Sequence, residues 1–187
     1  MPQFSSYCEY VQTLEPTNPH KVYHDTAYGF PIDSDDELFG RLILEINQAG
    51  LSWNTILLKQ ANFRRAYADF SIKKVAEFTD ADRARLLADA GIIRNRLKVS
   101  AAIHNAQVIM QLQNEHGSFK NWLDAHRGLS REDWTKLFGK TFKFTGGEIV
   151  NEFLVSTAYL PGAHVEGCRV REKIASDPKN QSKHSVR

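Results

Sequence analysis

Apolar residues recur along most of the chain at intervals of three or four positions, the spacing of one face of an α-helix. The clearest case is 38–49, which follows a predicted capping box formed by Ser34 and Glu37. Gly50 is expected to end this helix, and a second helix is predicted from Ser52 to about Phe70. The same pattern predicts further helices at 79–90, 94–115, 119–126, 134–138 and 148–159.

Extended structure is indicated only at Thr141–Thr145, and that run is short. The sequence therefore predicts an all-α fold. It contains no internal repeat and no Gly/Ser-rich linker, so we expect one helical domain over residues 1–168. The polar segment 169–187 lacks helical periodicity and is expected to be a mobile tail.

The charge is unevenly distributed along the 187 residues. The chain has a formal net charge of +2. Residues 1–90 carry 9 basic and 13 acidic side chains, whereas residues 91–187 carry 15 basic and 9 acidic ones. A basic half suits an anionic partner such as nucleic acid, although a solvated basic tail would give the same asymmetry. No apolar run reaches the length of a membrane span and no secretory leader is evident, so we expect a cytoplasmic protein.

The two cysteines, Cys8 and Cys168, exclude a disulfide-dense scaffold. His164 and Cys168 are separated by three residues and could bind one Zn²⁺ through imidazole nitrogen and thiolate. Adding Cys8 and His24 gives a Cys₂His₂ set drawn from both ends of the chain, which would be a closed structural site. The alternative is two buried, inert thiols and two surface histidines.

Glu45 lies at the edge of the apolar face of the 38–49 helix, where a carboxylate is costly unless it is paired. Trp53 follows one short turn later. A carboxylate beside an aromatic ring suits a pocket for a flat ligand, but a solvent-reaching Glu and a core Trp would give the same spacing. Tyr10, Tyr23 and Tyr28 add aromatic rings near the N-terminus, where they could stack on a ligand or belong to the core.

The segment 90–98 reads as a tight turn between two helices. Gly91 provides the turn, and Arg94, Arg96 and Lys98 follow it. Backbone N–H groups of such a hairpin can bind phosphate oxygens, with the three cations adding charge and no sequence information. The alternative is a simple helical hairpin with a solvated basic face. No P-loop, dinucleotide-binding glycine motif, HExxH motif or nucleophile elbow is present.

Together these segments resemble the type I DNA-3-methyladenine glycosylase family, which belongs to the helix-hairpin-helix DNA glycosylases. The matching stretches occur in family order and span roughly residues 8–168: 23–29 (YHDTAYG), 44–53 (LEINQAGLSW), 89–96 (DAGIIRNR), 142–146 (FKFTG) and 164–168 (HVEGC). The stretches around Glu45 and Gly91 are the most specific.

The resemblance implies a helix-hairpin-helix fold with a small zinc-binding lobe formed by about 1–32 and 159–168. Its four zinc ligands correspond to Cys8, His24, His164 and Cys168, which would bind one structural Zn²⁺ per chain. The resemblance further implies a monofunctional hydrolase that flips 3-methyladenine out of double-stranded DNA and excises it. We expect this protein to act as a monomer.

The site residues implied by the resemblance fall into three groups. Glu45 corresponds to the carboxylate that hydrogen-bonds the excised base. The base pocket corresponds to Tyr23, Trp53, Tyr28 and Tyr10. A loop that probes the duplex corresponds to Gln48, Gly50 and Leu51, with Leu51 as its wedge. The phosphate-binding hairpin corresponds to Gly91, Arg94, Arg96 and Lys98.

The sequence departs from the family pattern at several positions. Tyr10 and Tyr28 replace usual tryptophans, and Gly147, Glu148 and Asn151 replace two threonines and a tyrosine. Two alternative functions follow. One is a divergent member with changed or lost base specificity that acts as a damaged-DNA-binding protein, and the other is a non-enzymatic DNA-binding module stabilised by zinc.

Overall fold

The computed structural model describes residues 4–177, and every regular element in that range is a helix. The predicted all-α fold is therefore confirmed. No helix among these residues is both long enough and apolar enough to cross a membrane. The elements are, in chain order, α1 (Tyr7–Gln12), α2 (Pro19–Thr26), α3 (Asp35–Gln48), α4 (Trp53–Ala66), a 3₁₀ turn η1 (Ala68–Phe70), α5 (Ile72–Ala76), α6 (Asp80–Ala88), α7 (Arg96–His116), α8 (Phe119–Ala125), α9 (Arg131–Thr141), α10 (Gly147–Ser156) and α11 (Arg169–Ser176).

The contacts divide the chain into two compact units. The first combines the described residues up to Pro31 with those from Leu154 onward, and the second comprises 32–153. The boundary lies within α10. The first unit thus joins both ends of the chain, close to the lobe of about 1–32 and 159–168 that was expected.

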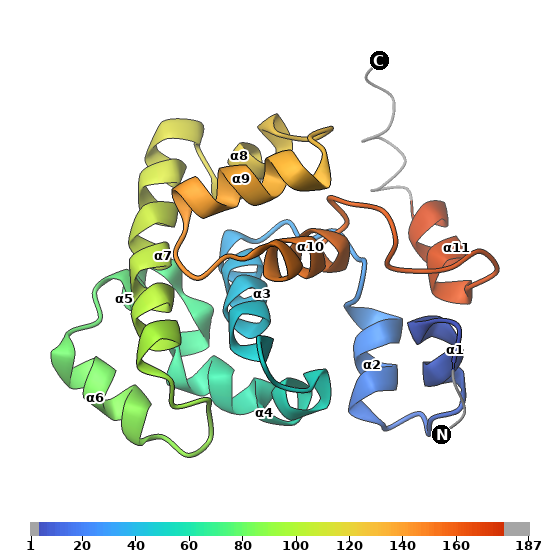
Figure 1. Ribbon diagram of the computed structural model, residues 1–187, viewed down its shortest axis with the longest axis horizontal. Coiled ribbons are helices and arrows are strands. Elements are labelled where there is room, and N and C mark those ends of the chain that lie inside the picture. Colours follow the sequence, from blue (N-terminus) through green and yellow to red (C-terminus); the bar gives the residue numbers. More distant parts are fainter. Residues whose placement is uncertain (1–3, 178–187) are drawn as a thin grey trace. The chain divides into compact units, whose positions relative to one another are not determined.

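In the second unit, the long helix α7 contacts α3, α5, α6 and α8 (Figure 1). The core is rich in aromatic side chains that are fully buried. They include Phe39, Phe63, Tyr67, Phe70, Phe119, Trp134, Phe138 and Phe153. Burial of side chains of this size dominates the stability of a domain.

Serine side chains begin four helices of the second unit. Ser34, Ser52, Ser118 and Ser130 each accept a hydrogen bond from the backbone N–H three residues later. This satisfies one of the donors that a helix start leaves without an intrahelical partner. The predicted capping at Ser34 and the helix start at Ser52 are thereby confirmed.

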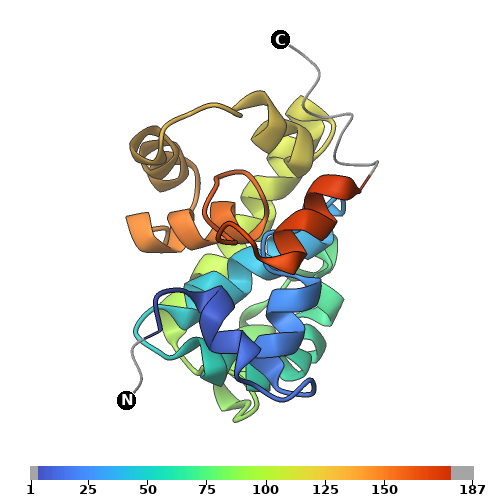
Figure 2. The same ribbon diagram turned by 90° about the vertical axis from the view of Figure 1, so that its right-hand side faces the viewer.

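The first unit has shorter helices. α1 and α2 contact each other and lie side by side (Figure 2). Cys8, Cys168 and Val170 form a small buried cluster, against which Phe30 and Ile174 pack.

Two predictions were wrong. Thr141–Thr145 does not form a strand, because α9 continues to Thr141 and Thr145 Oγ1 donates back to the carbonyl oxygen of Phe138, 3.1 Å away. The segment 169–187 does not begin as an irregular tail, because Arg169–Ser176 form α11. Val170 and Ile174, four positions apart, give this helix an apolar face that packs on the cysteine cluster. Residues 178–187 of the predicted tail lie outside the described range.

Candidate functional site

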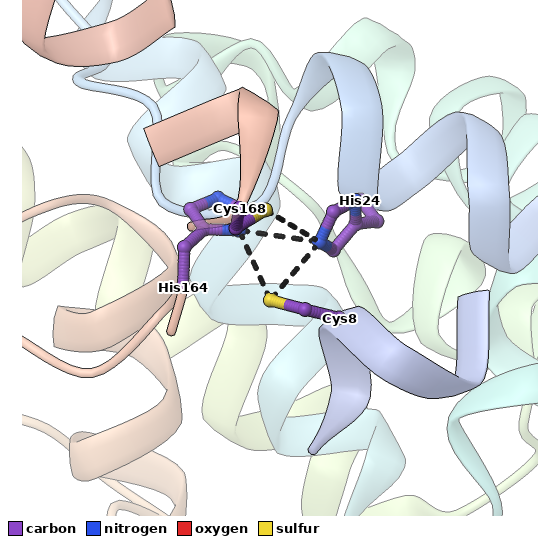
Figure 3. Close-up of side chains that lie close together, drawn as sticks. All are labelled: Cys8, His24, His164 and Cys168. Atoms are coloured by element: carbon purple, nitrogen blue, oxygen red, sulfur yellow. Dashed lines mark hydrogen bonds between the residues drawn. The ribbon is translucent and has the colours of Figure 1, made fainter. Parts of the chain in front are cut away.

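The four predicted metal ligands come together in the first unit (Figure 3). Cys8 lies on α1 and His24 on α2. His164 lies in the loop that precedes α11, and Cys168 is the N-cap residue of that helix. One ligand atom from each side chain lies within 4.8 Å of the others. Segments more than 130 residues apart in sequence therefore converge on one point.

The separations fit a tetrahedron around one zinc ion. Bonds of about 2.3 Å to sulfur and about 2.0–2.1 Å to nitrogen place two nitrogens about 3.3 Å apart and a nitrogen and a sulfur about 3.6 Å apart. His164 Nδ1 and His24 Nε2 are 3.2 Å apart. Nitrogen–sulfur distances are 3.3 Å from His24 Nε2 to Cys8 Sγ and 3.7 Å for the other three pairs. The residues present thus fit a metal ion.

Each histidine has its second ring nitrogen fixed by an acceptor. His24 Nδ1 lies 2.7 Å from Asp25 Oδ1, and His164 Nε2 lies 2.8 Å from the carbonyl oxygen of Tyr28. Because these oxygens can only accept, each histidine donates an N–H there and turns an unprotonated nitrogen toward the cluster. Such outer partners commonly orient metal-binding histidines.

The charge of the cluster depends on whether its thiols are protonated. Burial raises the pKa of the Cys8 thiol, an effect opposed by the backbone N–H of Val165. Burial lowers the pKa of His164, which keeps its imidazole neutral. Two thiolates and two neutral imidazoles carry a charge of −2, which a divalent ion would neutralise.

Gly29 allows the histidine loop to approach closely. Its φ is +74°, and a Cβ atom at this position would lie 2.5 Å from Ala163 Cβ and 3.1 Å from His164 Nε2. Its N–H donates to the carbonyl oxygen of Ser156, 2.9 Å away. Only glycine combines this backbone conformation with this contact.

The three predicted pocket tyrosines of this unit form one aromatic cluster with Tyr7. Tyr7 packs on Tyr10 at 6.3 Å and on Tyr28 at 5.5 Å between ring centroids, and Tyr28 packs on Tyr23 at 5.6 Å. The Tyr7 hydroxyl also donates to the carbonyl oxygen of His20. Because Tyr28 also supplies the carbonyl oxygen that orients His164, these rings are tied to the metal-binding residues.

In the second unit, Glu45 is a buried carboxylate near the C-terminal end of α3, with 4% of its surface exposed. α3 is followed by an exposed turn. Leu51 N–H donates to Gln48 O at 2.7 Å and Gln48 Nε2 donates to Leu51 O at 2.9 Å. Gly50, at φ +81°, completes the turn, and Leu51 is 39% exposed. The sequence thus places a fixed, apolar projection directly after a buried carboxylate.

Trp53 is the first residue of α4 and is partly buried. Ser52 precedes it and caps the helix. Glu45, the exposed turn and Trp53 therefore belong to one continuous stretch, as the sequence predicts.

The hairpin joins α6 to α7. Its first carbonyl, Ala90 O, accepts from Lys59 Nζ at 2.9 Å, and Gly91 N–H donates to Asp89 Oδ1 at 2.7 Å. Ile92 is buried and anchors it. These contacts fix the loop against α4 and α6 and leave its tip exposed.

The side chains of Arg94 and Arg96 extend from the exposed tip of the hairpin, and neither forms an ion pair within residues 4–177. In the same part of the chain, the backbone N–H groups of Ile93 and Arg94 donate no backbone hydrogen bond. Both kinds of donor are therefore available to an anion at this turn.

Lys98 differs from these two arginines. It is 5% exposed, and its ammonium group donates to the carbonyl oxygens of Asn47 at 2.9 Å and Ala49 at 2.7 Å. This burial does not support the predicted phosphate contact.

The sequence did not point to the roles of Asp25 and Gly29. Nor did it point to Asn105, whose side chain forms two hydrogen bonds with the backbone of Lys143. Asp25 could have been found, because it directly follows a predicted ligand. The constraint on Gly29 depends on the position of His164, 135 residues later, and no local pattern carries that information.

Comparison with known proteins shows a consistent set of relatives. The methyladenine glycosylase family model matches residues 14–136. DNA-3-methyladenine glycosylase 1 of Escherichia coli (strain K12) is 41% identical over 170 residues, which cover 79% of this chain and 88% of that protein.

Solved structures with this fold include a variant of 3-methyladenine DNA glycosylase I in complex with 3-methyladenine. It is 28% identical with a TM-score of 0.77, covering 83% of this chain and 94% of that chain. The 3-methyladenine DNA glycosylase I of Staphylococcus aureus is also 28% identical, with a TM-score of 0.76 and coverage of 83% and 93%.

Proposed function

The chain belongs to the methyladenine glycosylase family, and from this premise we propose that it is a DNA repair glycosylase that excises 3-methyladenine from alkylated double-stranded DNA. The observation that carries this proposal is the buried Glu45 carboxylate, placed six residues before the exposed Leu51 in the segment that the family model matches. The enzyme acts in the cytoplasm on nucleoid DNA, as a monomer.

The reaction begins with extrusion of the damaged nucleotide. A base inside a duplex is out of reach, and a lesion that pairs poorly costs less to flip. Leu51 is the wedge that occupies the vacated stack, and Gln48 and Gly50 shape the turn that presents it. Arg94 and Arg96, with the backbone around Gly91, hold the phosphates and carry no sequence information.

The chemical step needs only modest catalysis because N3-methylation makes adenine cationic. The Glu45 carboxylate stabilises this cation, while Trp53 of the same unit provides an aromatic surface for the base. The electron pair of the glycosidic bond passes to the base, which leaves neutral. A water oxygen bonds to the sugar C1′ and releases its proton to solvent. No lysine nucleophile is needed, so the enzyme has no lyase step.

Zn²⁺ is the proposed metal, one per chain, held by Cys8, His24, His164 and Cys168. Structural zinc sites are almost always tetrahedral with sulfur and nitrogen ligands. The two sulfurs and two nitrogens of this cluster lie near that spacing. All four positions are taken by protein atoms, so the ion is structural. It connects α1, α2 and α11 and takes no part in the reaction.

The test incubates methylated duplex with the wild-type protein and Glu45→Gln and identifies the released bases by chromatography. We expect 3-methyladenine from the wild type and a release rate reduced by about 10²-fold or more in the variant. Glu37→Gln is the matched control: it lies on the same helix, but its exposed carboxylate pairs with Arg64 at 2.7 Å, so its release rate should be unchanged.

Three outcomes oppose the proposal. No 3-methyladenine from the wild type refutes it. Release of a different purine identifies a divergent specificity, to which Tyr10, Tyr28, Gly147, Glu148 and Asn151 would then contribute. Binding to abasic duplex without release of any base identifies a DNA-binding protein.

A further inference from the structure

Lys98 is a buried cation whose hydrogen bonds go to backbone carbonyls. Its Nζ donates to Asn47 O at 2.9 Å and to Ala49 O at 2.7 Å, and it lies 5.7 Å from the centroid of the Phe144 ring. One ammonium group thus joins the beginning of α7 to the end of α3, to the turn that follows it, and to the loop before α10. All of these residues belong to the second unit.

The two carbonyl acceptors lie at the C-terminal end of α3. The last carbonyls of a helix have no intrahelical partner and form the negative end of its dipole. Here one belongs to Asn47, near the α3 end that carries Glu45, and the other to Ala49, the C-cap residue of α3 within the Gln48–Leu51 turn. Burial lowers the pKa of Lys98, but the carbonyl dipoles favour its charged form.

Phe144 lies with its ring next to the ammonium group. Its backbone has φ +60°, a strained conformation for a residue with a side chain of this size. Fully buried Asn105 fixes the preceding residue with two hydrogen bonds: Lys143 N–H donates to Asn105 Oδ1 at 2.8 Å, and Asn105 Nδ2 donates to Lys143 O at 3.0 Å. A buried amide therefore fixes the residue before the strained aromatic whose ring lies next to the Lys98 charge.

We infer that Lys98 is a positioning residue of the excision reaction, which holds the end of α3 and the Gln48–Leu51 turn so that Glu45 and the Leu51 wedge keep a fixed relative placement. This inference rests on the proposed glycosylase function. It assigns to Lys98 an internal role in place of a phosphate contact, and the two roles make different predictions.

The first test measures single-turnover excision of 3-methyladenine by Lys98→Met, which keeps the length of the side chain and removes its donors. Because a misplacement of reacting groups by about 1 Å can cost about 100-fold in rate, we expect the excision rate constant to fall about 10- to 100-fold. The loss should appear in kcat rather than KM. The dependence of binding on salt should not change, because no phosphate contact is removed.

Arg94→Ala provides the opposite signature. Removing a phosphate contact should reduce the slope of log affinity against log salt by about 0.9. A flattened salt slope in Lys98→Met, with kcat unchanged, would show that Lys98 binds phosphate and would overturn the inference.

Arg85→Met is the matched structural control. Arg85 also donates to a carbonyl at a helix end, Ala66 O at 3.0 Å, in the same unit. This variant should lose stability without a change in kcat. An equal loss of kcat in both variants would also overturn the inference, because it would reflect general destabilisation. Lys98→Gln, which removes the charge but keeps an amide donor, is the second variant if Lys98→Met does not fold, and should show a smaller loss in kcat.

Hydrogen exchange gives a readout that does not depend on activity. Lys98→Met should accelerate exchange of the Leu51 amide, which donates to Gln48 O, while Arg85→Met should accelerate it only near the end of α4. If the wild type releases no 3-methyladenine, the proposed function fails, and exchange still decides whether Lys98 holds this turn. Unchanged exchange at 48–51 in Lys98→Met refutes the positioning role.

Discussion

The metal-binding unit is built from α1, α2 and α11, which contain six, eight and eight residues, whereas the unit that carries Glu45 includes a helix of 21 residues. Isolated helices of fewer than about 12 residues are marginal in water. The buried apolar cluster around the ligands consists of Cys8, Cys168 and Val170, supported by Phe30 and Ile174. The Glu45 unit instead buries Phe39, Phe63, Phe70 and many other large side chains.

This difference suggests two sources of stability in one chain. The Glu45 unit holds the segment that carries Glu45 by close packing and helix capping. The metal-binding unit brings together both ends of the chain, and two of its four ligands are thiols in its small core. Its stability should therefore depend on zinc, and that of the other unit should not. The predictions below separate these two dependences.

Removing zinc should have the largest effect. Structural zinc sites contribute apparent binding energies of about 10–16 kcal/mol in small domains, far more than the first unit can gain from its few buried side chains. A strong chelator should therefore cause rapid amide exchange in α1, α2 and α11 while α3 and α7 stay protected. Cys168→Ser should show the same pattern at any zinc concentration.

His20→Ala is the control for this experiment. His20 lies on α2 like His24, and its ring packs on Tyr7 at 5.9 Å, but it is not one of the four ligands. It should keep one zinc per chain, measured by elemental analysis. Retained protection of α1 and α11 in zinc-free protein would show that packing alone stabilises the unit, which would remove the contrast between the two units.

A smaller effect is expected from Gly29→Ala, which changes the loop behind a ligand without removing one. The new methyl group would meet Ala163 and the His164 ring, so the histidine must shift. Changes to residues that orient a metal ligand reduce affinity about 10- to 100-fold. We expect weaker zinc binding in a competition assay with a chromogenic chelator, and recovery of stability with excess zinc.

Gly167→Ala separates the contact from the backbone strain. Gly167 has a similar φ of +77° and lies in the loop that carries His164, but a Cβ atom there would have no neighbour within 4 Å. It should cost stability through its backbone conformation and leave zinc affinity unchanged. Equal zinc affinities for the two variants would mean that the Gly29 contact does not control His164.

The same two units show which features could be predicted from the sequence and which could not. The helix starts at Ser34 and Ser52 could be predicted because a cap and the helix it begins are adjacent in the chain. The residue types allowed the Cys₂His₂ set to be proposed, but choosing it over inert thiols required the family resemblance, because Cys8 and His164 are brought together only by folding. α11 was not predicted because its two apolar residues pack on the cluster that contains Cys8, a contact that exists only in the folded chain. The burial of Lys98 was missed for a similar reason: its two carbonyl partners lie about 50 positions earlier, and a run of three cations reads as one solvated face.

The smallest effect, and the one that zinc should not correct, is expected from Gly40→Ala in α3. A Cβ atom at Gly40 would lie 2.4 Å from Cδ2 of Phe70, a ring that is almost fully buried and whose backbone has φ +60°. Overpacking of this kind costs about 1–3 kcal/mol. Helix propensity returns roughly 0.5–1 kcal/mol of this, because alanine is favoured over glycine inside a helix. Urea unfolding should therefore show a net loss of at most about 2.5 kcal/mol in the free energy of unfolding. Gly139→Ala in α9, where a Cβ atom has no neighbour within 4 Å, should show only the gain. A packing defect in an independent unit cannot be repaired by an ion bound in the other unit. If excess zinc restored the stability of Gly40→Ala, as is expected for Gly29→Ala, the stability of the Glu45 unit would therefore depend on the metal as well.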